Sequence, residues 1–425
     1  MPTYIVEGGY PISGTVRPAG NKNAALPAIA AALLTDEPVI LDNVPDIGDV
    51  RSMLALLRNL GAEAVWDGPN RIRIRAANLV TPAVDYRLAE RIRASILLAG
   101  PMLARAGRIE LPPPGGDVIG RRRLDTHLLA LTKLGASIEI GPPFHMKAGT
   151  LSGADIFLDE PSVTATENAI MAAVLALGRT RLRNAAAEPH VQDLCALLVS
   201  MGARIAGIGT HVLEIEGVER LGGASFRIGS DHIEVGSFIS LAAVTRGELT
   251  ILDAAPEHLD STLLAFDRLG VVCEVRGSTV FVPAGQSLRV RTDAGGHIPK
   301  IDDGPWPAFP ADLTSIALVT ATQCSGTILI HEKMFESRMF FTDKLVSMGA
   351  QVILCDPHRA VVVGPSRLRG GTVETPDIRA GMALLIAALC ARGRSRIFNI
   401  GQIERGYERI DQRLRDLGAR IERSE

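Results

Sequence analysis

Residues 198–207 read LVSMGARIAG, and the six letters LVSMGA return at 345–350. Apolar residues at helical spacing lead into the Met-Gly pair, and a β-rich run follows it. A glycine just past the end of a helix can adopt the left-handed backbone conformation that caps the last carbonyl groups. The segment therefore predicts a helix, a glycine stop and a strand.

Looser copies of this segment occur along the whole chain. They follow one another at intervals of about 70 residues, which is the signature of an internal repeat. The glycines at the six stops are Gly61, Gly135, Gly202, Gly270, Gly349 and Gly418. A second pattern alternates with the first, and joins an Ala/Leu-rich helix, a short turn and an alternating strand, as in 171–186 and 385–400. Six units of two helices and several strands predict an α/β protein.

The repeat also indicates how the chain is divided. A solenoid is the usual outcome of a repeat, but this unit is long for a solenoid and its Gly-rich loops differ from copy to copy. We expect two globular lobes of three units each. Residues 4–20, YIVEGGYPISGTVRPAG, read as a pair of strands without a helix of their own, so we expect them to complete a lobe built elsewhere in the chain.

Composition limits the classes of function. Hydrophobic residues make up 47% of the 425 residues, charged residues 22%, and the formal net charge is −2. These values are typical of a packed globular protein and argue against a general binder of nucleic acid or anionic membranes. No apolar stretch reaches the roughly 18 residues of a transmembrane helix, and the start does not read as a signal peptide. We expect neither nucleic acid nor membrane as a partner.

The residues of metal, redox and nucleotide sites form no recognisable motif. The five cysteines are scattered without a CxxC pair, and the nine histidines show no HxxxH or HExxH spacing. This usage favours a reduced, cytoplasmic compartment and predicts no metal site. Neither GxxxxGK[ST] nor a strand-linked GxGxxG is present, so an ATPase or a dinucleotide enzyme is not supported. We expect no cofactor.

Several charged residues stand where helices are expected to begin. Lys22 and Asn23 open the helix of GNKNAALP, where a helix N-terminus favours anions, although a solvated loop lysine is an equal alternative. Asp312 precedes an apolar helix, where an aspartate is most often an N-cap. Guanidinium groups match phosphates and carboxylates, and arginines recur near expected helix starts on different repeats, at Arg93, Arg338, Arg379 and Arg405. The pattern predicts an anion-binding cleft between the lobes.

Residues 111–123 read LPPPGGDVIGRRR and place one carboxylate, Asp117, on a Gly-Gly loop ahead of three arginines. Taken alone, the stretch is typical of a solvated surface turn. Considered with the other segments, the same stretch has a second interpretation, as part of a functional site.

Together these segments resemble the UDP-N-acetylglucosamine 1-carboxyvinyltransferases, the UDP-GlcNAc enolpyruvyl transferases within the EPSP synthase-like superfamily. The resemblance covers essentially the whole chain. It rests on GNKNAALP (20–27), RASILLAGP (93–101), PGGDVIGRR (114–122), SVTATEN (162–168), ESRMF (336–340), DIRAGMAL (377–384) and the ending from 404 to 422. The PGDKS-type opening of the shikimate enzymes is absent.

The resemblance implies a fold and a division into domains. The fold is a two-lobed inside-out α/β barrel, or α/β prism, with six βαβαββ repeats, three per domain. One domain is residues 22–229, with a mobile lid at 112–123. The other is residues 1–21 plus 230–425, and the active site lies in the cleft between the two.

The resemblance also implies a reaction. The enolpyruvyl group of phosphoenolpyruvate moves to the 3-hydroxyl of UDP-N-acetylglucosamine and phosphate leaves, by addition and elimination without a metal, as the first committed step of peptidoglycan biosynthesis.

Roles follow for residues at the matching motif positions. The phosphate and carboxylate of phosphoenolpyruvate are clamped by Lys22, Arg122 and Arg405, near the matching arginines Arg93, Arg338 and Arg379. Asn23 and Asp312 contact the sugar, and Asp312 is the candidate general base. The UDP segments contain Asp125, Ser162, Val163 and Thr164, with Glu188 nearby.

Asp117 stands where most members of the family have a cysteine. That residue is thought to protonate the methylene carbon during addition and to help the product leave. A carboxylic acid can do the same if it is protonated, so we expect the closed lid to desolvate Asp117. Because fosfomycin alkylates the thiol in the family, we expect this chain to be insensitive to it.

Two alternatives remain open at the level of sequence. The chain could be a paralogue that enolpyruvylates another uridine nucleotide, because several positions depart from the family pattern, among them Ser337 and Gln402. It could also be a repeat-built binding protein that has lost catalysis. Retention of Lys22, Arg122, Asp312 and Arg405 on separate repeats argues against that loss.

Overall fold

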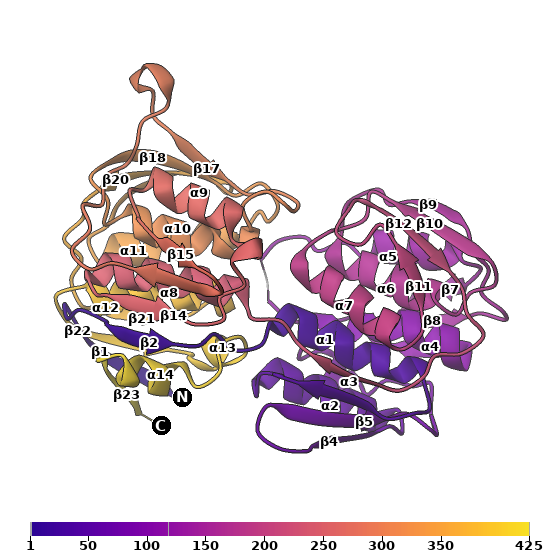
Figure 1. The fold of residues 1–425 in the computed structure, drawn as a ribbon. Helices are drawn as coiled ribbons and strands as arrows, with labels where there is room; N and C mark the ends of the chain where they lie inside the picture. Colours follow the sequence, from indigo (N-terminus) through magenta and orange to yellow (C-terminus); the bar gives the residue numbers. More distant parts are fainter. Residues whose placement is uncertain (1, 118, 425) are drawn as a thin grey trace. The chain divides into compact units, whose positions relative to one another are not determined.

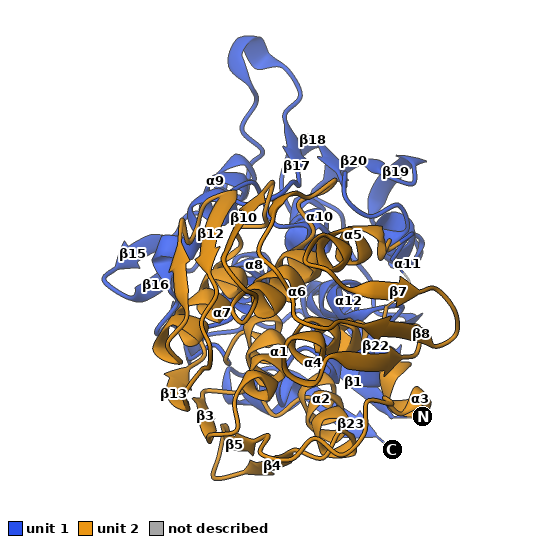
Figure 2. Ribbon diagram, turned by 90° about the vertical axis from the view of Figure 1, so that its right-hand side faces the viewer, with its two compact units in different colours: residues 1–19, 118–121, 230–425 blue, residues 20–117, 122–229 orange. Residues whose placement is uncertain are grey.

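The computed structural model describes residues 2–117 and 119–424 as a mixed α/β protein with six sheets (Figure 1). The chain divides into two compact units. Unit 1 comprises residues 1–19, 118–121 and 230–425, and unit 2 comprises residues 20–117 and 122–229 (Figure 2). The chain therefore passes from one unit to the other more than once.

Unit 2 contains seven α-helices among its described residues. They are α1 (Lys22–Ala31), α2 (Gly48–Asn59), α3 (Tyr86–Ala89), α4 (Ala99–Ala106), α5 (Asp125–Lys133), α6 (Val163–Ala173) and α7 (Pro189–Ser200), with 3₁₀ turns η1 (Ala32–Leu34) and η2 (Arg93–Leu98). Its strands form three sheets. These have the orders β13-β3-β5-β4, β6-β8-β7 and β11-β12-β10-β9.

The strands of unit 2 are short. Their bounds are β3 (Val39–Asp42), β4 (Glu63–Trp66), β5 (Arg71–Arg75), β6 (Arg108–Leu111), β7 (Ser137–Glu139), β8 (Phe144–Lys147), β9 (Asp155–Phe157), β10 (Arg179–Arg183), β11 (Arg204–Ala206), β12 (Val212–Glu216) and β13 (Ala224–Arg227).

Unit 1 also contains seven α-helices among its described residues. They are α8 (His232–Thr245), α9 (Asp260–Arg268), α10 (Thr314–Ala321), α11 (Thr342–Ser347), α12 (Ile378–Cys390), α13 (Gly401–Glu404) and α14 (Ile410–Asp416). The 3₁₀ turns are η3 (Pro256–His258), η4 (Ala294–Gly296), η5 (Ala311–Leu313) and η6 (Arg338–Phe341).

Three sheets again surround the helices, with the orders β21-β22-β1-β23, β15-β16-β14-β2 and β17-β18-β20-β19. The strands are β1 (Thr3–Gly8), β2 (Gly14–Val16), β14 (Leu249–Ile251), β15 (Glu274–Arg276), β16 (Thr279–Val282), β17 (Lys300–Asp302), β18 (Gly326–His331), β19 (Gln351–Asp356), β20 (Arg359–Gly364), β21 (Thr372–Glu374), β22 (Gly393–Phe398) and β23 (Arg420–Ser424).

Every four-stranded sheet has the same pairing pattern. One edge strand pairs in parallel with its neighbour, as β17 does with β18, and the other two pairings are antiparallel. The three-stranded sheet keeps a parallel bridge, Ala83 to Glu110, at the equivalent edge. A parallel pair requires a crossover, which a helix usually provides. The expected α/β class and six-unit inside-out arrangement are therefore confirmed.

The core of unit 1 is built by its Ala/Leu-rich helices. Figure 1 shows α8, α10 and α12 inside the ring of sheets, and every residue of α8 and α10 is buried. A helix that is apolar on all sides must be covered on all sides. No helix among the described residues is both long and apolar enough to cross a membrane.

The glycine stops are in the left-handed conformation that the repeat predicts. At the six stops φ lies between 77° and 105°. The N-terminal strands, described from residue 3, differ in one respect from the expected strand pair. β1 lies between β22 and β23, whereas β2 pairs with β14 in another sheet. The two strands are therefore not partners, because each completes a separate sheet of unit 1.

Candidate active site

Asp312 lies at the centre of a buried charge cluster in unit 1. Its Oδ1 accepts a hydrogen bond from Arg338 Nη2 at 3.1 Å, and its Oδ2 accepts from Arg379 Nε at 3.0 Å. Both guanidinium groups are almost fully buried, while the Asp312 side chain is 27% exposed. Two adjacent cations favour the ionised carboxylate. The cluster thus presents one accessible carboxylate held by two arginines.

Helix starts place these three side chains. Asp312 is in the 3₁₀ turn η5 that runs into α10, and it does not cap α10, whose preceding residue is Leu313. The N-cap interpretation of Asp312 is therefore wrong, because both of its oxygens are engaged by arginines. Arg379 is the second residue of α12, whose N-cap Asp377 accepts the Arg379 and Ala380 amide protons. Arg338 begins η6.

The environment of Arg379 explains how a cation is buried there. Burial alone would lower the pKa of Arg379, but Asp312 and then Tyr407 outweigh it, so the pKa lies above its usual value. The guanidinium also lies 5.5 Å from the centre of the Tyr407 ring. Opposite charge and an aromatic face are the usual partners of a buried guanidinium.

Arg405 lies at the other end of a short helix. It follows α13 as its C-cap rather than beginning a helix, and its Nη1 donates to Gln402 Oε1 at 2.8 Å. The sequence expectation of a helix start at Arg405 is therefore wrong.

An aromatic cluster stands next to Asp312. His232, His258 and Trp306 lie edge to face, with ring centroids 6.2 to 6.4 Å apart. Burial, followed by the charges of His258 and Arg379, lowers the pKa of His232 to about 3 against the opposing effect of Asp312. His232 is therefore neutral near pH 7 and acts as a packing group. Sequence analysis did not identify this cluster, because its members are far apart in the chain.

In unit 2, Lys22 forms a buried ion pair. It is the first residue of α1, and Asn21 caps that helix by accepting from the amides of Asn23 and Ala24. Lys22 Nζ lies 2.7 Å from Asp49 Oδ2, and both side chains are largely buried. The solvated-lysine alternative is excluded by this contact. Asp49 was missed from sequence because nothing in its own segment marks it.

Arg93 and Arg122 come together at the base of the predicted lid. Arg93 Nη2 donates to the Arg122 carbonyl oxygen at 2.5 Å and to the Arg123 carbonyl oxygen at 3.3 Å. Burial and then the neighbouring Arg122 lower the pKa of Arg93 to about 10, so it stays cationic at pH 7. The backbone of the loop at Gly115 packs directly against the backbone of Glu90, since a Cβ at Gly115 would lie 1.7 Å from the Glu90 carbonyl oxygen. Asp117 is partly buried.

The first turn of α6 carries three of the predicted nucleotide-binding residues. Ser162 is the N-cap, and Val163 and Thr164 are the first helical residues. Thr164 Oγ1 lies 3.0 Å from His127 Nε2. Asp125, the first residue of α5, is exposed and pairs with Arg123. Glu188 precedes α7 at its N-cap position.

A buried network supports this helix start. Asn168 Oδ1 accepts from the Gly100 amide at 2.7 Å, and Nδ2 donates to the Ile96 carbonyl at 2.9 Å. The same Nδ2 lies 2.9 Å from His127 Nδ1. His127 Nδ1 is then the acceptor, and Nε2 carries the proton that is donated to Thr164. Burial lowers the pKa of His127 to about 3, which keeps the ring neutral.

The sequence-predicted residues thus fall into separate groups. Unit 1 brings Asp312, Arg338 and Arg379 together, and unit 2 brings Arg93 to Arg122 and joins Ser162, Val163 and Thr164 on one helix start. The described residues contain no group of three or more His, Cys, Asp or Glu side chains that could hold a metal ion.

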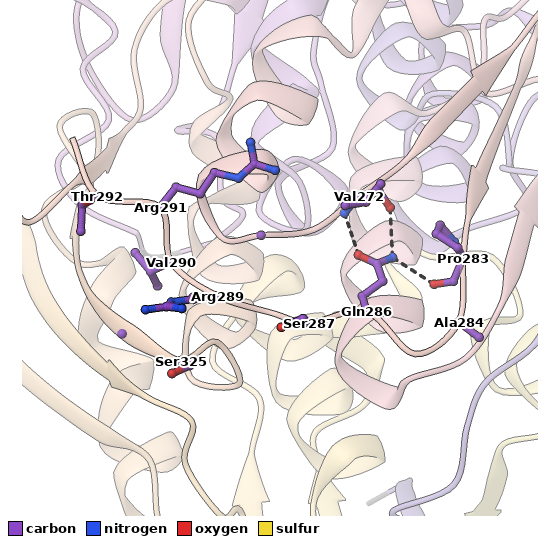
Figure 3. Close-up of a pocket in the computed structure, with 12 residues that line it drawn as sticks. Val272, Pro283, Ala284, Gln286, Ser287, Arg289, Val290, Arg291, Thr292 and Ser325 are labelled. Atoms are coloured by element: carbon purple, nitrogen blue, oxygen red, sulfur yellow. Dashed lines mark hydrogen bonds between the residues drawn. The ribbon is translucent and has the colours of Figure 1, made fainter. Parts of the chain in front are cut away.

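Unit 1 also has an open cavity of about 900 Å³ away from these groups (Figure 3). Arg289, Arg291 and Ser325 line it, and Gln286 holds its wall by bonds to the backbone of Val272 and Pro283. None of the sequence-predicted site residues is in the lining.

Comparisons with known proteins place these features in context. The sequence model of the family described as EPSP synthase (3-phosphoshikimate 1-carboxyvinyltransferase) matches residues 6–414. A UDP-N-acetylglucosamine 1-carboxyvinyltransferase of Bradyrhizobium diazoefficiens is 61% identical over 99% of this chain and 97% of its own length. One of Treponema denticola is 57% identical over the whole of both chains.

Solved structures are similar along the full length. The enolpyruvyl transferase NikO from Streptomyces tendae has a TM-score of 0.88 at 25% identity and covers 100% of this chain and 99% of its own. EPSP synthase from Acinetobacter baumannii has a TM-score of 0.76 at 16% identity over the whole of both chains, and it supports the fold alone.

Proposed function

The chain belongs to the EPSP synthase family of enolpyruvyl transferases, and we propose that it transfers the enolpyruvyl group of phosphoenolpyruvate to the 3-hydroxyl of UDP-N-acetylglucosamine with release of phosphate. The observation that carries the proposal is the Asp312 carboxylate held between the buried guanidiniums of Arg338 and Arg379. Full-length identity of 57–61% to two enzymes that carry this name supports UDP-N-acetylglucosamine as the acceptor.

The cluster can serve both halves of the chemistry. Phosphoenolpyruvate brings a phosphate and a carboxylate, and guanidinium groups bind such anions in bidentate geometry. When Arg338 and Arg379 turn part of their donors to this anion, Asp312 gains the basicity that a general base needs. Asp312 then accepts the proton of the 3-hydroxyl while that oxygen bonds to C2 of phosphoenolpyruvate.

Asp117 supplies the second proton in this proposal. As a carboxylic acid it delivers its proton to C3, which gives a tetrahedral phospholactoyl adduct. Loss of phosphate from C2 and of a proton from C3 then restores the double bond in the product. Lys22, Arg122 and Arg405 complete the clamp on phosphoenolpyruvate, with Arg93 behind Arg122. The carriers of these roles lie in both units, so we propose that the site lies in the cleft between two three-repeat domains, under a lid at 112–123.

The acceptor is assigned to the segments of unit 2. Asn23 contacts the sugar, and the UDP group lies at the start of α6, with Ser162, Val163 and Thr164, and near Asp125 and Glu188. The neutral His127 ring fixes Thr164 in one orientation. We assign the reaction to the first committed step of peptidoglycan biosynthesis and to the cytoplasm, which agrees with five free cysteines.

The test is product analysis. Purified protein is incubated with phosphoenolpyruvate and UDP-N-acetylglucosamine, and mass spectrometry follows the enolpyruvyl nucleotide while a phosphate assay follows release in the same sample. Equal amounts of both products support the proposal, and an Asp312→Asn variant is the matched control. A product only with another uridine nucleotide, such as UMP, would reassign the acceptor. Phosphoenolpyruvate binding without any product would indicate a non-catalytic binding protein.

A further inference from the structure

Two buried carboxyl groups, those of Asp303 and Glu332, lie near Arg338 in addition to Asp312. Asp303 directly follows β17, and Glu332 directly follows β18. These strands are parallel neighbours in a register that sets Asp302 opposite His331. Asp303 and Glu332, the residues that follow this pair, therefore lie side by side. The backbone follows this register, since the Asp303 amide donates to the His331 carbonyl at 3.3 Å.

Both carboxyl groups are withdrawn from solvent. Asp303 is 1% exposed and Glu332 is 0% exposed. One oxygen of each has a backbone donor: the Lys333 amide donates to Asp303 Oδ1, and the Phe335 amide donates to Glu332 Oε1 at 3.2 Å. The remaining oxygens, Asp303 Oδ2 and Glu332 Oε2, are buried and make no well-formed hydrogen bond among the described residues, although the Glu332 carboxyl interacts with Asp303 and with the Thr314 hydroxyl. If both groups were ionised, these two oxygens would share a dry space without a proton between them.

A proton held between the two carboxyls supplies a donor. Two carboxylates in one dry site cannot both ionise easily, and their protons come off in steps that belong to the pair. Burial, together with the charge and a hydrogen bond of Asp303, raises the pKa of Glu332 to about 8 against the lowering effect of Arg338. At pH 7 the pair therefore carries one negative charge rather than two.

That single charge faces Arg338. Glu332 Oε2 lies 3.7 Å from Arg338 Nε, while Arg338 Nη2 donates to Asp312 Oδ1 at 3.1 Å. The guanidinium is 3% exposed and lies 5.0 Å from the centre of the Phe335 ring. Arg338 thus lies between two carboxyl groups that reach neighbouring nitrogens of its guanidinium, and its position depends on the balance between them.

Other charged groups around the pair are already engaged. The Lys333 ammonium pairs with Asp302, and the His358 ring bonds to the Glu332 backbone carbonyl at 2.7 Å. The Thr314 hydroxyl acts with Arg338 to lower the pKa of Glu332, and Arg379 is held by Asp312. Among the charged groups on the adjoining elements, Arg338 is the one that ties the pair to Asp312.

We propose that Asp303 and Glu332 share a single proton and act as positioning residues that keep the Arg338 guanidinium on Asp312. The consequence for catalysis rests on the proposed enolpyruvyl transfer. Loss of the shared proton puts a second negative charge beside Arg338, which draws the guanidinium toward Glu332 and away from Asp312. Transfer activity therefore falls as the pH rises through the titration of the pair.

Isosteric variants test this because each fixes the charge of the pair. Asp303→Asn and Glu332→Gln each leave one carboxylate and remove the titratable proton. Both are expected to retain wild-type kcat/KM within about threefold at pH 7 and to lose the alkaline fall. In the wild type kcat/KM for phosphoenolpyruvate drops about tenfold per pH unit above the pKa of the pair. The double variant has neither a charge nor a titratable proton beside Arg338, so it also lacks the alkaline fall.

Asp302→Asn is the matched control. Asp302 is the adjacent acid, it pairs with Lys300 and Lys333, and it lies outside the pair. Its variant keeps the alkaline fall. If Asp303→Asn and Glu332→Gln keep the same alkaline fall as the wild type, the proposal is overturned.

A second readout does not depend on turnover. Infrared spectra of the unliganded protein show the carbonyl stretch of a protonated carboxyl, which shifts in D₂O. Burial also raises the pKa of Glu167, so that carboxyl adds to the band in every variant. The part of the band that disappears above the pKa of the pair is expected in the wild type and is expected to be absent from both single variants. If the wild type has the band but makes no product, the enolpyruvyl transfer fails and the pair stands. If a band with the same titration persists in both variants, the shared proton is refuted.

Discussion

Replacement of Asn168 by alanine is expected to destabilise unit 2 strongly. Asn168 lies on α6 with no exposed surface, and its amide joins three partners: the Gly100 amide, the Ile96 carbonyl and His127 Nδ1. α4 approaches α6 closely at this point, since a Cβ at Gly100 would lie 2.4 Å from the Asn168 carbonyl oxygen. The side chain therefore holds together two helices and the orientation of the His127 ring.

The magnitude follows from the groups left behind. Truncation to alanine leaves a buried N–H, a buried carbonyl and a ring nitrogen without partners, and each unsatisfied group costs about 1–3 kcal/mol. Water that enters the vacated space recovers part of this, so the expected loss in the free energy of unfolding is about 3–5 kcal/mol. His127 also loses its fixed tautomer, so the KM for the acceptor nucleotide rises while the KM for phosphoenolpyruvate changes less.

The assay can report on unit 2 alone. The chain has two tryptophans, Trp66 in β4 of unit 2 and Trp306 in unit 1. In a Trp306→Phe background, urea unfolding followed by Trp66 fluorescence measures unit 2. Lys133→Ala on the exposed face of α5 is the control, with an expected change within about 0.5 kcal/mol. A loss below about 1 kcal/mol for Asn168→Ala would refute the network as a source of stability.

Three further changes have defined outcomes. Because the pKa of Glu332 is raised from 4.5 to about 8 in the folded protein, the contribution of this group to stability is fully present below about pH 4.5 and falls by on the order of a few kcal/mol up to pH 8. Glu332→Gln should reduce the fall in melting temperature between pH 5 and 9, with the remaining slope due to other buried carboxyl groups such as Glu167. Asp117→Cys should allow stoichiometric covalent labelling by fosfomycin, detected by mass spectrometry, whereas labelling of the wild type would contradict the role given to Asp117. Asp312→Asn should lower kcat roughly 10²–10⁴-fold without raising the KM for phosphoenolpyruvate, since it releases Arg338 and Arg379 to bind the anion; a raised KM would indicate that Asp312 organises them.

The fold could be predicted from the sequence because the features that determine it are local and recur in every repeat. Each Leu-Gly or Met-Gly stop requires a residue in the left-handed backbone conformation. Each Ala-rich helix must be packed against other elements on all sides. Strand partnership is not local. β3 pairs with β13, which is far along the chain, and β1 and β2 join different sheets. No property of residues 3–16 by themselves distinguishes that arrangement from a hairpin.

The candidate site could be predicted from the sequence only in part. Arg338, Arg379 and Asp312 attract notice as charges at the starts of apolar helices, and a motif resemblance assigns them roles. Their contact depends on how η5, η6 and α12 pack, which composition does not specify. Asp303 and Glu332 were missed as a pair, because their proximity follows from the register of β17 and β18 rather than from their spacing. Asp49 and Asn168 were missed for the same reason, since each acts through a partner distant in the sequence.

Phosphate release from phosphoenolpyruvate, measured with and without UDP-N-acetylglucosamine and with fosfomycin in a parallel sample, tests the central claim most directly. The account predicts release that requires the nucleotide sugar and continues unchanged in fosfomycin, because Asp117 offers no thiol. Release that stops with covalent labelling would contradict the role of Asp117. The absence of release with any uridine nucleotide would contradict the transferase itself.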